Sequence, residues 1–348
     1  MKALLTAAFL LLIGFVFIIM SGGLSGCKPS DPIVQHDTIV TLPPVVIIKD
    51  SVNYIKKIEE DYYQSFPGFY SRTKDFTFHY DAKNRVSFIG IRYYYSSSVS
   101  DSFTTQFFYN SNSLRPYQII LPDFVMSQPG RPSYYDTIRL SYKNDTIPIV
   151  DSGTHLVYND VTIQPEYKPL KRIFQYPDNK TVLTHWYGSL RATDNLSLIR
   201  KDSISYNSTG TANFIKTNFY DGVNLPQGYA VANNFSYSGF INPLSVLNIS
   251  GSIYAYIYAP VRKEILGNIY HPVIHNGSFL PYYLDFCNTL LPTSFAFSGY
   301  YNDGSLIGSG AINVTIQITP WPKRSTYPET VISNAPNGDK VRQKYSYY

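Results

Sequence analysis

Cysteine is scarce in this chain of 348 residues, with Cys27 and Cys287 as its only two. Two cysteines exclude a framework of several disulfides and a thiolate zinc site within one chain. The nearest other metal-like pattern is His271 and His275. Pro272 disfavours a helix between them, and in a strand residues four apart are separated by about 13 Å, so only a loop could bring both to one ion. We therefore predict no metal site and no cofactor.

Catalytic motifs are also missing. The chain has no Gly-x-Ser-x-Gly turn, no glycine-rich phosphate loop and no His-Glu-x-x-His sequence. The 24 acidic residues could include a pair that hydrolyses glycans. Such a pair is defined by its separation in space, which a sequence does not give. We expect a protein that is not an enzyme.

Charge is sparse, with 29 basic and 24 acidic residues and a charged share of 15%. Such a balance argues against nucleic-acid binding. We interpret the basic pairs as solvated strand ends, with contact to anionic outer-membrane lipid as the alternative. These pairs are Lys56-Lys57, Lys171-Arg172, Arg200-Lys201, Arg262-Lys263 and Lys323-Arg324.

A long apolar run occurs at the N-terminus, from Leu4 to Met20, after the basic Lys2. Its 17 residues are few for a membrane-spanning helix and suit a secretory signal peptide. The sequence Leu-Ser-Gly-Cys that ends at Cys27 resembles a bacterial lipobox. That resemblance implies cleavage before Cys27 and attachment of acyl chains such as palmitate to it. Several acyl chains give a stable membrane anchor.

The predicted organisation has three parts. Residues 1–26 are the lipoprotein signal peptide, and residues 27–50 are the lipidated cysteine and a proline-rich tether. Residues 51–348 are a single repetitive antiparallel β domain. The mature chain would carry 28 basic and 24 acidic residues, because cleavage removes one lysine. Lys28 and Asp31 match in part a surface-export pattern of some diderm bacteria, so we predict the outer membrane and leave its side open.

Aromatic residues are abundant, with 33 tyrosines and 21 phenylalanines. Tyr254, Tyr256 and Tyr258 alternate with Ile253, Ala255 and Ile257, a period of two that indicates a strand. On an outward face the three tyrosines would form successive platforms about 7 Å apart for a sugar chain. On an inward face they would only pack.

Tyrosine followed by a polar turn recurs along the chain. The tyrosines are Tyr80, Tyr109, Tyr142, Tyr176, Tyr206 and Tyr237. Their separations are 29, 33, 34, 30 and 31 residues, which is a repeat long enough for two strands and two turns. The sequence therefore predicts consecutive antiparallel hairpins.

This repeat predicts an all-β fold, because helical periodicity is nearly absent. We expect a long antiparallel meander of roughly 16–20 strands, starting near residues 52–62 and including a hairpin turn at Asn337-Gly338. So many strands are expected to be curled or closed into a barrel-like sheet, since exposed edges promote aggregation.

Several of these segments together resemble one group of bacterial outer-membrane lipoproteins. They are the lipobox, the tether, "YDAKNR" from Tyr80, "NPL" from Asn242 and the closing "YPETV…PNGDKVRQKYSYY". The group carries a domain of unknown function with a porin-like fold. The Tyr80-Asp81 turn also loosely resembles YD-repeat proteins. The resemblance implies a barrel-like sheet at the outer membrane and brings no catalytic residues.

Five sites read Asp-Ser/Thr-aliphatic, among them Asp136-Thr137-Ile138 and Asp202-Ser203-Ile204. They are either strand starts after a turn aspartate or sites that resemble bacterial O-glycosylation acceptors.

Two functional classes stay open. The first is a non-catalytic surface binding or structural module, anchored in the membrane through Cys27, for a polysaccharide or another cell-envelope protein. The second is a carrier of an apolar ligand in the barrel lumen. A glycan-acting enzyme comes third.

Overall fold

The first tyrosine-turn unit forms a hairpin, as its pattern predicts. Strand β2 (Tyr70–Tyr80) is followed by a turn and by β3 (Val86–Tyr95). In the turn, the backbone NH of Asp81 donates to the carbonyl of Arg85 at 2.8 Å. The Asp81 carboxylate pairs with the Arg85 guanidinium at 2.7 Å. Asn84 has a φ of 58°, a left-handed conformation that asparagine tolerates.

Strand, polar turn and strand then repeat through the described chain. The computed structural model describes residues 54–63, 70–95, 98–122, 135–143, 147–158, 165–178, 180–189, 195–209, 211–220, 224–244, 290–306, 312–334 and 340–348. The remaining strands are β1 (Ile55–Tyr63), β4 (Ser98–Tyr109), β5 (Pro116–Pro122), β6 (Tyr135–Lys143), β7 (Ile147–Tyr158), β8 (Pro165–Gln175), β9 (Thr181–Gly188), β10 (Ser197–Tyr206), β11 (Ala212–Tyr220), β12 (Pro226–Ile241), β13 (Leu290–Tyr301), β14 (Ile312–Trp321), β15 (Arg324–Asn334) and β16 (Lys340–Tyr347). None of the described residues is helical.

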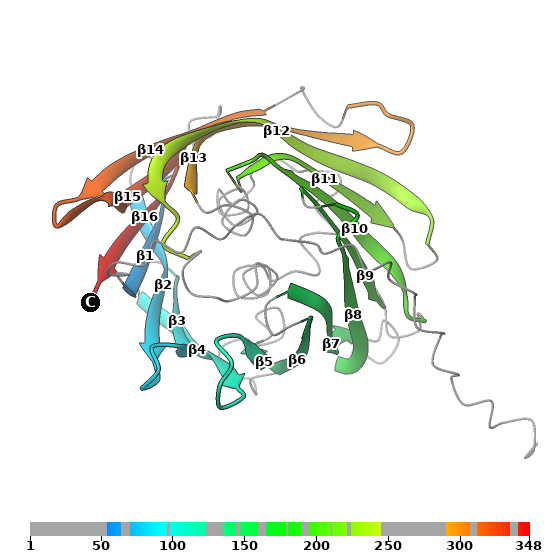
Figure 1. The fold of residues 1–348 in the computed structure, drawn as a ribbon, viewed down its shortest axis with the longest axis horizontal. Coiled ribbons are helices and arrows are strands. Elements are labelled where there is room, and N and C mark those ends of the chain that lie inside the picture. Colours follow the sequence, from blue (N-terminus) through cyan, green and yellow to red (C-terminus); the bar gives the residue numbers. More distant parts are fainter. Residues whose placement is uncertain are drawn as a thin grey trace, which may run out of the picture. The chain divides into compact units, whose positions relative to one another are not determined.

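Each strand pairs antiparallel with the next, and β1 pairs with β16, so sixteen strands form a closed barrel. Figure 1 shows the colours running from blue to red once around the ring. The predicted all-β antiparallel meander of roughly 16–20 strands is confirmed, in its closed form. The described residues all belong to one compact unit, Thr41–Tyr348.

The thirty-residue repeat corresponds to one hairpin. Each repeated tyrosine ends an even-numbered strand, lies close to that end or directly follows it. In an antiparallel meander the even-numbered strands all end at the same rim. The repeated tyrosines therefore gather at one rim of the barrel, where β1 begins and β16 ends.

The two faces of the wall differ in polarity, as β6 shows. Its buried side chains are Asp136, Ile138 and Leu140, whereas Arg139, between the last two, and Ser141, directly after them, are exposed. In a closed barrel the face that carries the buried apolar side chains is the inner one. The inner face is thus largely apolar and the outer face largely polar.

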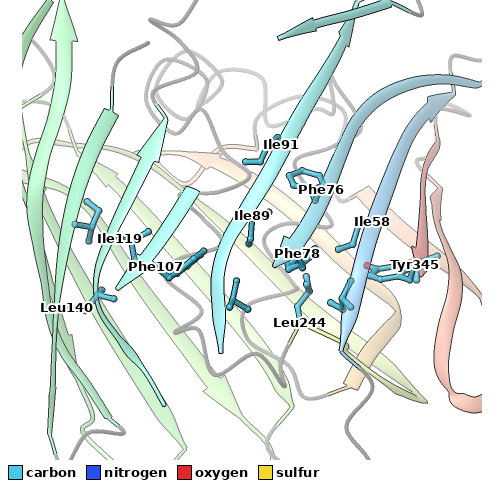
Figure 2. Packing of buried hydrophobic residues seen from close by; sticks show 14 of the residues in the cluster. Ile58, Phe76, Phe78, Ile89, Ile91, Phe107, Ile119, Leu140, Leu244 and Tyr345 are labelled. Atoms are coloured by element: carbon cyan, nitrogen blue, oxygen red, sulfur yellow. The ribbon is translucent and has the colours of Figure 1, made fainter. Parts of the chain in front are cut away.

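Most of the buried apolar side chains form one large cluster, and Figure 2 shows its members on β1–β6 and β16. A smaller cluster lies on β11–β14 and consists of Ala212, Ile215, Ala232, Phe295 and Val314. The fully buried members of the large cluster include Ile58, Phe76, Phe78 and Ile89, each with 0% of its surface exposed. Leu244, in the turn that follows β12, joins this cluster and is 2% exposed. This explains the "NPL" sequence, because the Asn242 side chain accepts the NH of Leu244 at 3.1 Å and holds that turn.

Hydroxyls of the repeated tyrosines clamp the hairpins. Each clamp joins a tyrosine near the end of an even-numbered strand to a backbone carbonyl near the start of the strand before it. Among the repeated tyrosines the pairs are Tyr80 to Ile55 at 2.8 Å, Tyr109 to Val86 at 2.9 Å, Tyr142 to Pro116 at 2.9 Å, and Tyr237 to Ala212. Tyr347, at the end of β16, binds the Pro328 carbonyl in the same way at 2.7 Å. The repeated tyrosines therefore have a structural role, because these hydroxyls hold the two strands of a hairpin together.

The seam between β1 and β16 is held on both faces of the wall. The Asp61 carboxylate accepts the Arg342 guanidinium at 2.6 Å on the outer face. On the inner face Glu60 lies 3.4 Å from the Gln343 amide and is 1% exposed. At the rim the NH of Tyr348 donates to the Tyr54 carbonyl at 3.1 Å.

The interpretation of the basic pairs as strand ends is wrong for two of them. Lys171-Arg172 lies within β8 and Arg200-Lys201 within β10. Because side chains alternate along a strand, each pair places one cation on each face of the wall. Lys171 is exposed, whereas Arg172 is only 4% exposed.

The interpretation as strand starts also fails at Asp202-Ser203-Ile204. Asp202 lies in the middle of β10 and is 5% exposed, so it cannot belong to a turn.

We predict that Tyr109→Phe lowers the free energy of unfolding by about 1–2 kcal/mol, because it removes the hydroxyl that binds the Val86 carbonyl. Burial raises the pKa of Tyr109, so this donor stays protonated in the wild type. Urea unfolding followed by tryptophan fluorescence measures the change. The matched control is Tyr167→Phe, whose ring is 52% exposed. Equal losses in the two variants would contradict a role for the clamp.

Candidate functional site

The predicted site residues lie outside the part of the chain that the structure describes. These are Cys27 and the ladder Tyr254, Tyr256 and Tyr258. Cys287, His271 and His275 lie outside it as well. Among the described residues, no group of three or more His, Cys, Asp or Glu side chains is placed to hold a metal ion.

A buried polar cluster that the sequence did not reveal lies on the inner face of β9–β11. Asp202 stands opposite Thr184 and Thr217 in the strand register. One carboxylate oxygen accepts Arg200 Nε and Thr217 Oγ1, each at 2.7 Å. The other accepts Thr184 Oγ1 at 2.8 Å and Trp186 Nε1 at 2.9 Å. Four donors therefore surround this carboxylate.

Two arginines lie against the indole of the same cluster. Arg172 and Arg200 stand opposite Trp186 on the two neighbouring strands. Their guanidinium carbons lie 4.3 Å and 5.3 Å from the indole. Stacking of cations on an aromatic ring is favourable, and more so away from water. The cluster binds β8, β9 and β10 together.

Electrostatics keep Asp202 ionised. Burial raises its pKa, but the charge of Arg200 and the hydrogen bonds from Arg200, Thr217 and Thr184 lower it by more, so the net pKa lies below the usual value. A carboxylate with a lowered pKa and four bound donors is a poor general acid. The arrangement suits a structural role.

Polar side chains dominate the outer face. The outward positions of β14 are Asn313, Thr315, Gln317 and Thr319, and all four are exposed. A membrane-spanning barrel carries the opposite pattern, an apolar outer band about 25 Å tall around a polar interior. Within the described residues no helix is long and apolar enough to cross a membrane.

Several aromatic rings also lie on the outer face. Tyr229 and Tyr300 pair across β12 and β13 and stack with centroids 4.7 Å apart. The Lys216 ammonium lies 4.3 Å from the centre of the Tyr229 ring. Tyr135 and Tyr167 are 40% and 52% exposed. Partly exposed tyrosines suit contacts with sugars and protein surfaces.

Histidines on the outer face pair with neighbours in the sheet. His79 stacks on Phe88, with ring centroids 4.0 Å apart. His185 stands opposite Lys201, and burial together with the Lys201 charge lowers its pKa.

Two solved structures are similar to the chain over most of its length. A porin-like protein from Bacteroides vulgatus ATCC 8482 is 11% identical with a TM-score of 0.46, and the match covers 85% of this chain and 99% of that one. A porin-like protein from Bacteroides uniformis ATCC 8492 is 12% identical with a TM-score of 0.41, covering 84% and 96%. The barrel described above follows from the chain's own strand pairing.

No family model and no curated protein matches the chain. The resemblance to the outer-membrane lipoprotein group and to YD-repeat proteins therefore stays a prediction.

We predict that Asp202→Asn lowers the free energy of unfolding by about 3–5 kcal/mol at pH 7, because it leaves the Arg200 charge uncompensated. The wild-type pKa is lowered, so this stabilisation is present above the unfolded value of about 3.9 and is lost as pH falls through the folded pKa. The gap between wild type and variant should therefore shrink on acidification.

Urea unfolding at pH 7 and at about pH 3 measures both stabilities. The control is Asp303→Asn, at an exposed turn aspartate whose pKa is also lowered. A gap that stays as large in acid as at pH 7 would show that the Asp202 charge is not responsible.

Proposed function

We propose that the protein is a lipid-anchored barrel at the outer membrane that acts in water as a surface binding or structural module. Its partner would be a glycan or another protein of the cell envelope. The observation that carries the proposal is the polarity of the wall, with apolar side chains inside and polar ones outside.

This polarity favours a barrel that lies beside the bilayer. Arg139 and Lys171 occupy outward, exposed positions within their strands. On the lipid face of a spanning barrel, each such cation costs about 2–4 kcal/mol at the bilayer midplane. A water-exposed body needs another attachment, which the predicted lipidation of Cys27 and the tether of residues 27–50 would supply.

Exposed tyrosines favour the binding class. Tyr135, Tyr167 and Tyr301 each expose more than a third of their surface. Flat rings with a hydroxyl group bind sugars and protein surfaces through both stacking and hydrogen bonds. The predicted ladder Tyr254, Tyr256 and Tyr258 stays part of this proposal.

The apolar inner face favours a second candidate, a carrier of an apolar ligand. Phe76, Phe78 and Ile91 are exposed by 1% or less, so a ligand would have to displace what covers them. Surface binding needs no such displacement and is the better supported function. A glycan-acting enzyme stays the third candidate.

We predict that Cys27→Ser releases the protein from the membrane fraction, because it removes the acylated side chain. Cell fractionation and immunoblotting measure the distribution. Retention equal to that of the wild type would contradict lipid anchoring.

We also predict that a protease site inserted within residues 28–50 frees the barrel into the supernatant without detergent, since its outer face is polar. Cleavage of washed membranes followed by sedimentation measures the release. Mock-treated membranes are the control. A cleaved body that sediments with the membranes would show that the barrel itself is inserted, and the proposed function would then fail.

A further inference from the structure

Several cations lie at outward positions of the strands from β6 to β11, apart from other charges. One of them, Lys143, is the last residue of β6. The other four are Arg139, Lys171, Lys201 and Lys216, which we call the basic face. Arg139 and Lys171 are exposed, and Lys201 and Lys216 are half-buried. Each occupies the face of its strand opposite to the buried inner residues.

The strand register sets these cations along a slanting line. Arg139 and Lys171 both stand opposite Ser152, so they share one cross-strand row two strands apart. Lys201 lies in the next row and Lys216 in the row after that, each further around the barrel. From the spacing of strands and residues, neighbouring cations are about 8–12 Å apart at the backbone.

No described side chain neutralises the basic face. The acidic side chains described on β6–β13 are Asp136, Glu166 and Asp202, and their register places all three on the inner face. In the described part of the chain, none of the four cations forms an ion pair.

Outward cations at the seam behave differently. Lys57 pairs with Glu59 at 2.7 Å and with Asp75 at 2.9 Å, and Arg342 pairs with Asp61 at 2.6 Å. Some outward cations near the seam are therefore ion-paired, whereas, among the described residues, the four of the basic face are not.

We propose that the basic face binds an acidic polysaccharide, a linear glycan that carries carboxylates. This inference rests on the proposed function and specifies its partner. Cations in a line, several ångströms apart, fit regularly repeated charges on an extended polymer. A single compact anion would need donors that converge within about 3 Å of one point.

Tyrosines on the same outer wall add surfaces for sugar rings. Tyr135 lies four residues before Arg139 on β6, and Tyr167 lies four residues before Lys171 on β8, each on the same outward face. Both rings are exposed. A glycan could thus meet charges and flat rings on one surface.

Curvature favours a flexible polymer over a flat membrane. Sixteen strands spaced about 4.8 Å apart and tilted by about 40° give a barrel radius of about 16 Å. The basic face spans five of the sixteen strand gaps, about a third of the circumference. A flat membrane that touches the middle of the basic face would then lie about 7 Å from the strands at either end of that face. A flexible polysaccharide can follow the curve.

The test uses the full-length protein in detergent and polygalacturonic acid as the probe. One variant combines Arg139→Gln, Lys171→Gln, Lys201→Gln and Lys216→Gln. The matched control removes the same charge from other sectors through Lys56→Gln, Lys83→Gln, Lys323→Gln and Lys344→Gln. Urea unfolding first establishes that both variants are folded.

We expect the wild type to bind the probe, with affinity that falls as salt is added and with no binding to neutral dextran. Loss of one exposed charge contact lowers the affinity about threefold, so the basic-face variant, which loses four, should bind the probe about 50–100-fold more weakly. The control variant should lose less than about threefold.

Three results would overturn the inference. Equal losses in the two variants would show that net charge alone is responsible. The wild type could instead fail to bind the probe but bind anionic lipid vesicles better than neutral ones. If only the basic-face variant loses that preference, the surface is a membrane-binding surface. Absence of binding to any acidic glycan would reject the partner, while release of the barrel by tether cleavage would leave the proposed function intact.

Discussion

Closure of the sheet between β1 and β16 is the constraint on which the other features depend. Without that pairing, the sixteen strands would present two open edges and two ordinary faces. With it, one face becomes an interior, and apolar residues such as Phe78 and Ile89 are withdrawn from water. The seam joins the first and last strands, which are separated in sequence by nearly the whole domain. Polar contacts hold it on both faces, from Asp61 to Arg342 outside and from Glu60 to Gln343 inside.

Side-chain alternation then decides what each charge does. Lys171 and Arg172 are neighbours in sequence, yet one faces water on the basic face and the other packs against Trp186 inside the wall. Inside, charges are compensated, as Asp202 is by Arg200. Outside, a charge without a partner costs little because water solvates it, so it is available for an external ligand.

Much of the fold was predictable because its information is local. The spacing of the repeated tyrosines predicted the hairpins, and the residue types predicted the strands. The cost of open edges predicted a sheet that is curled or closed, and the structure shows the closed form. The Asp202 cluster was not predictable, since it joins Thr184, Asp202 and Thr217 through a strand register that no motif encodes. The basic face was not predictable for the same reason. Its four cations come from four strands and become neighbours only when the sheet is assembled. Single-sequence patterns also mistook the pairs at Lys171 and Lys201 for strand ends.

The tyrosine clamps also carry a consequence for how the chain reaches its native state. The clamp from Tyr80 to Ile55 spans 25 residues, and the clamp from Tyr109 to Val86 spans 23, so each can form inside a single hairpin. The contact between Tyr348 and Phe78 spans 270 residues and requires the finished chain. Short loops close at a smaller entropic cost than long ones. Folding should therefore proceed as locked hairpins added side by side, with ring closure as the late and slow step.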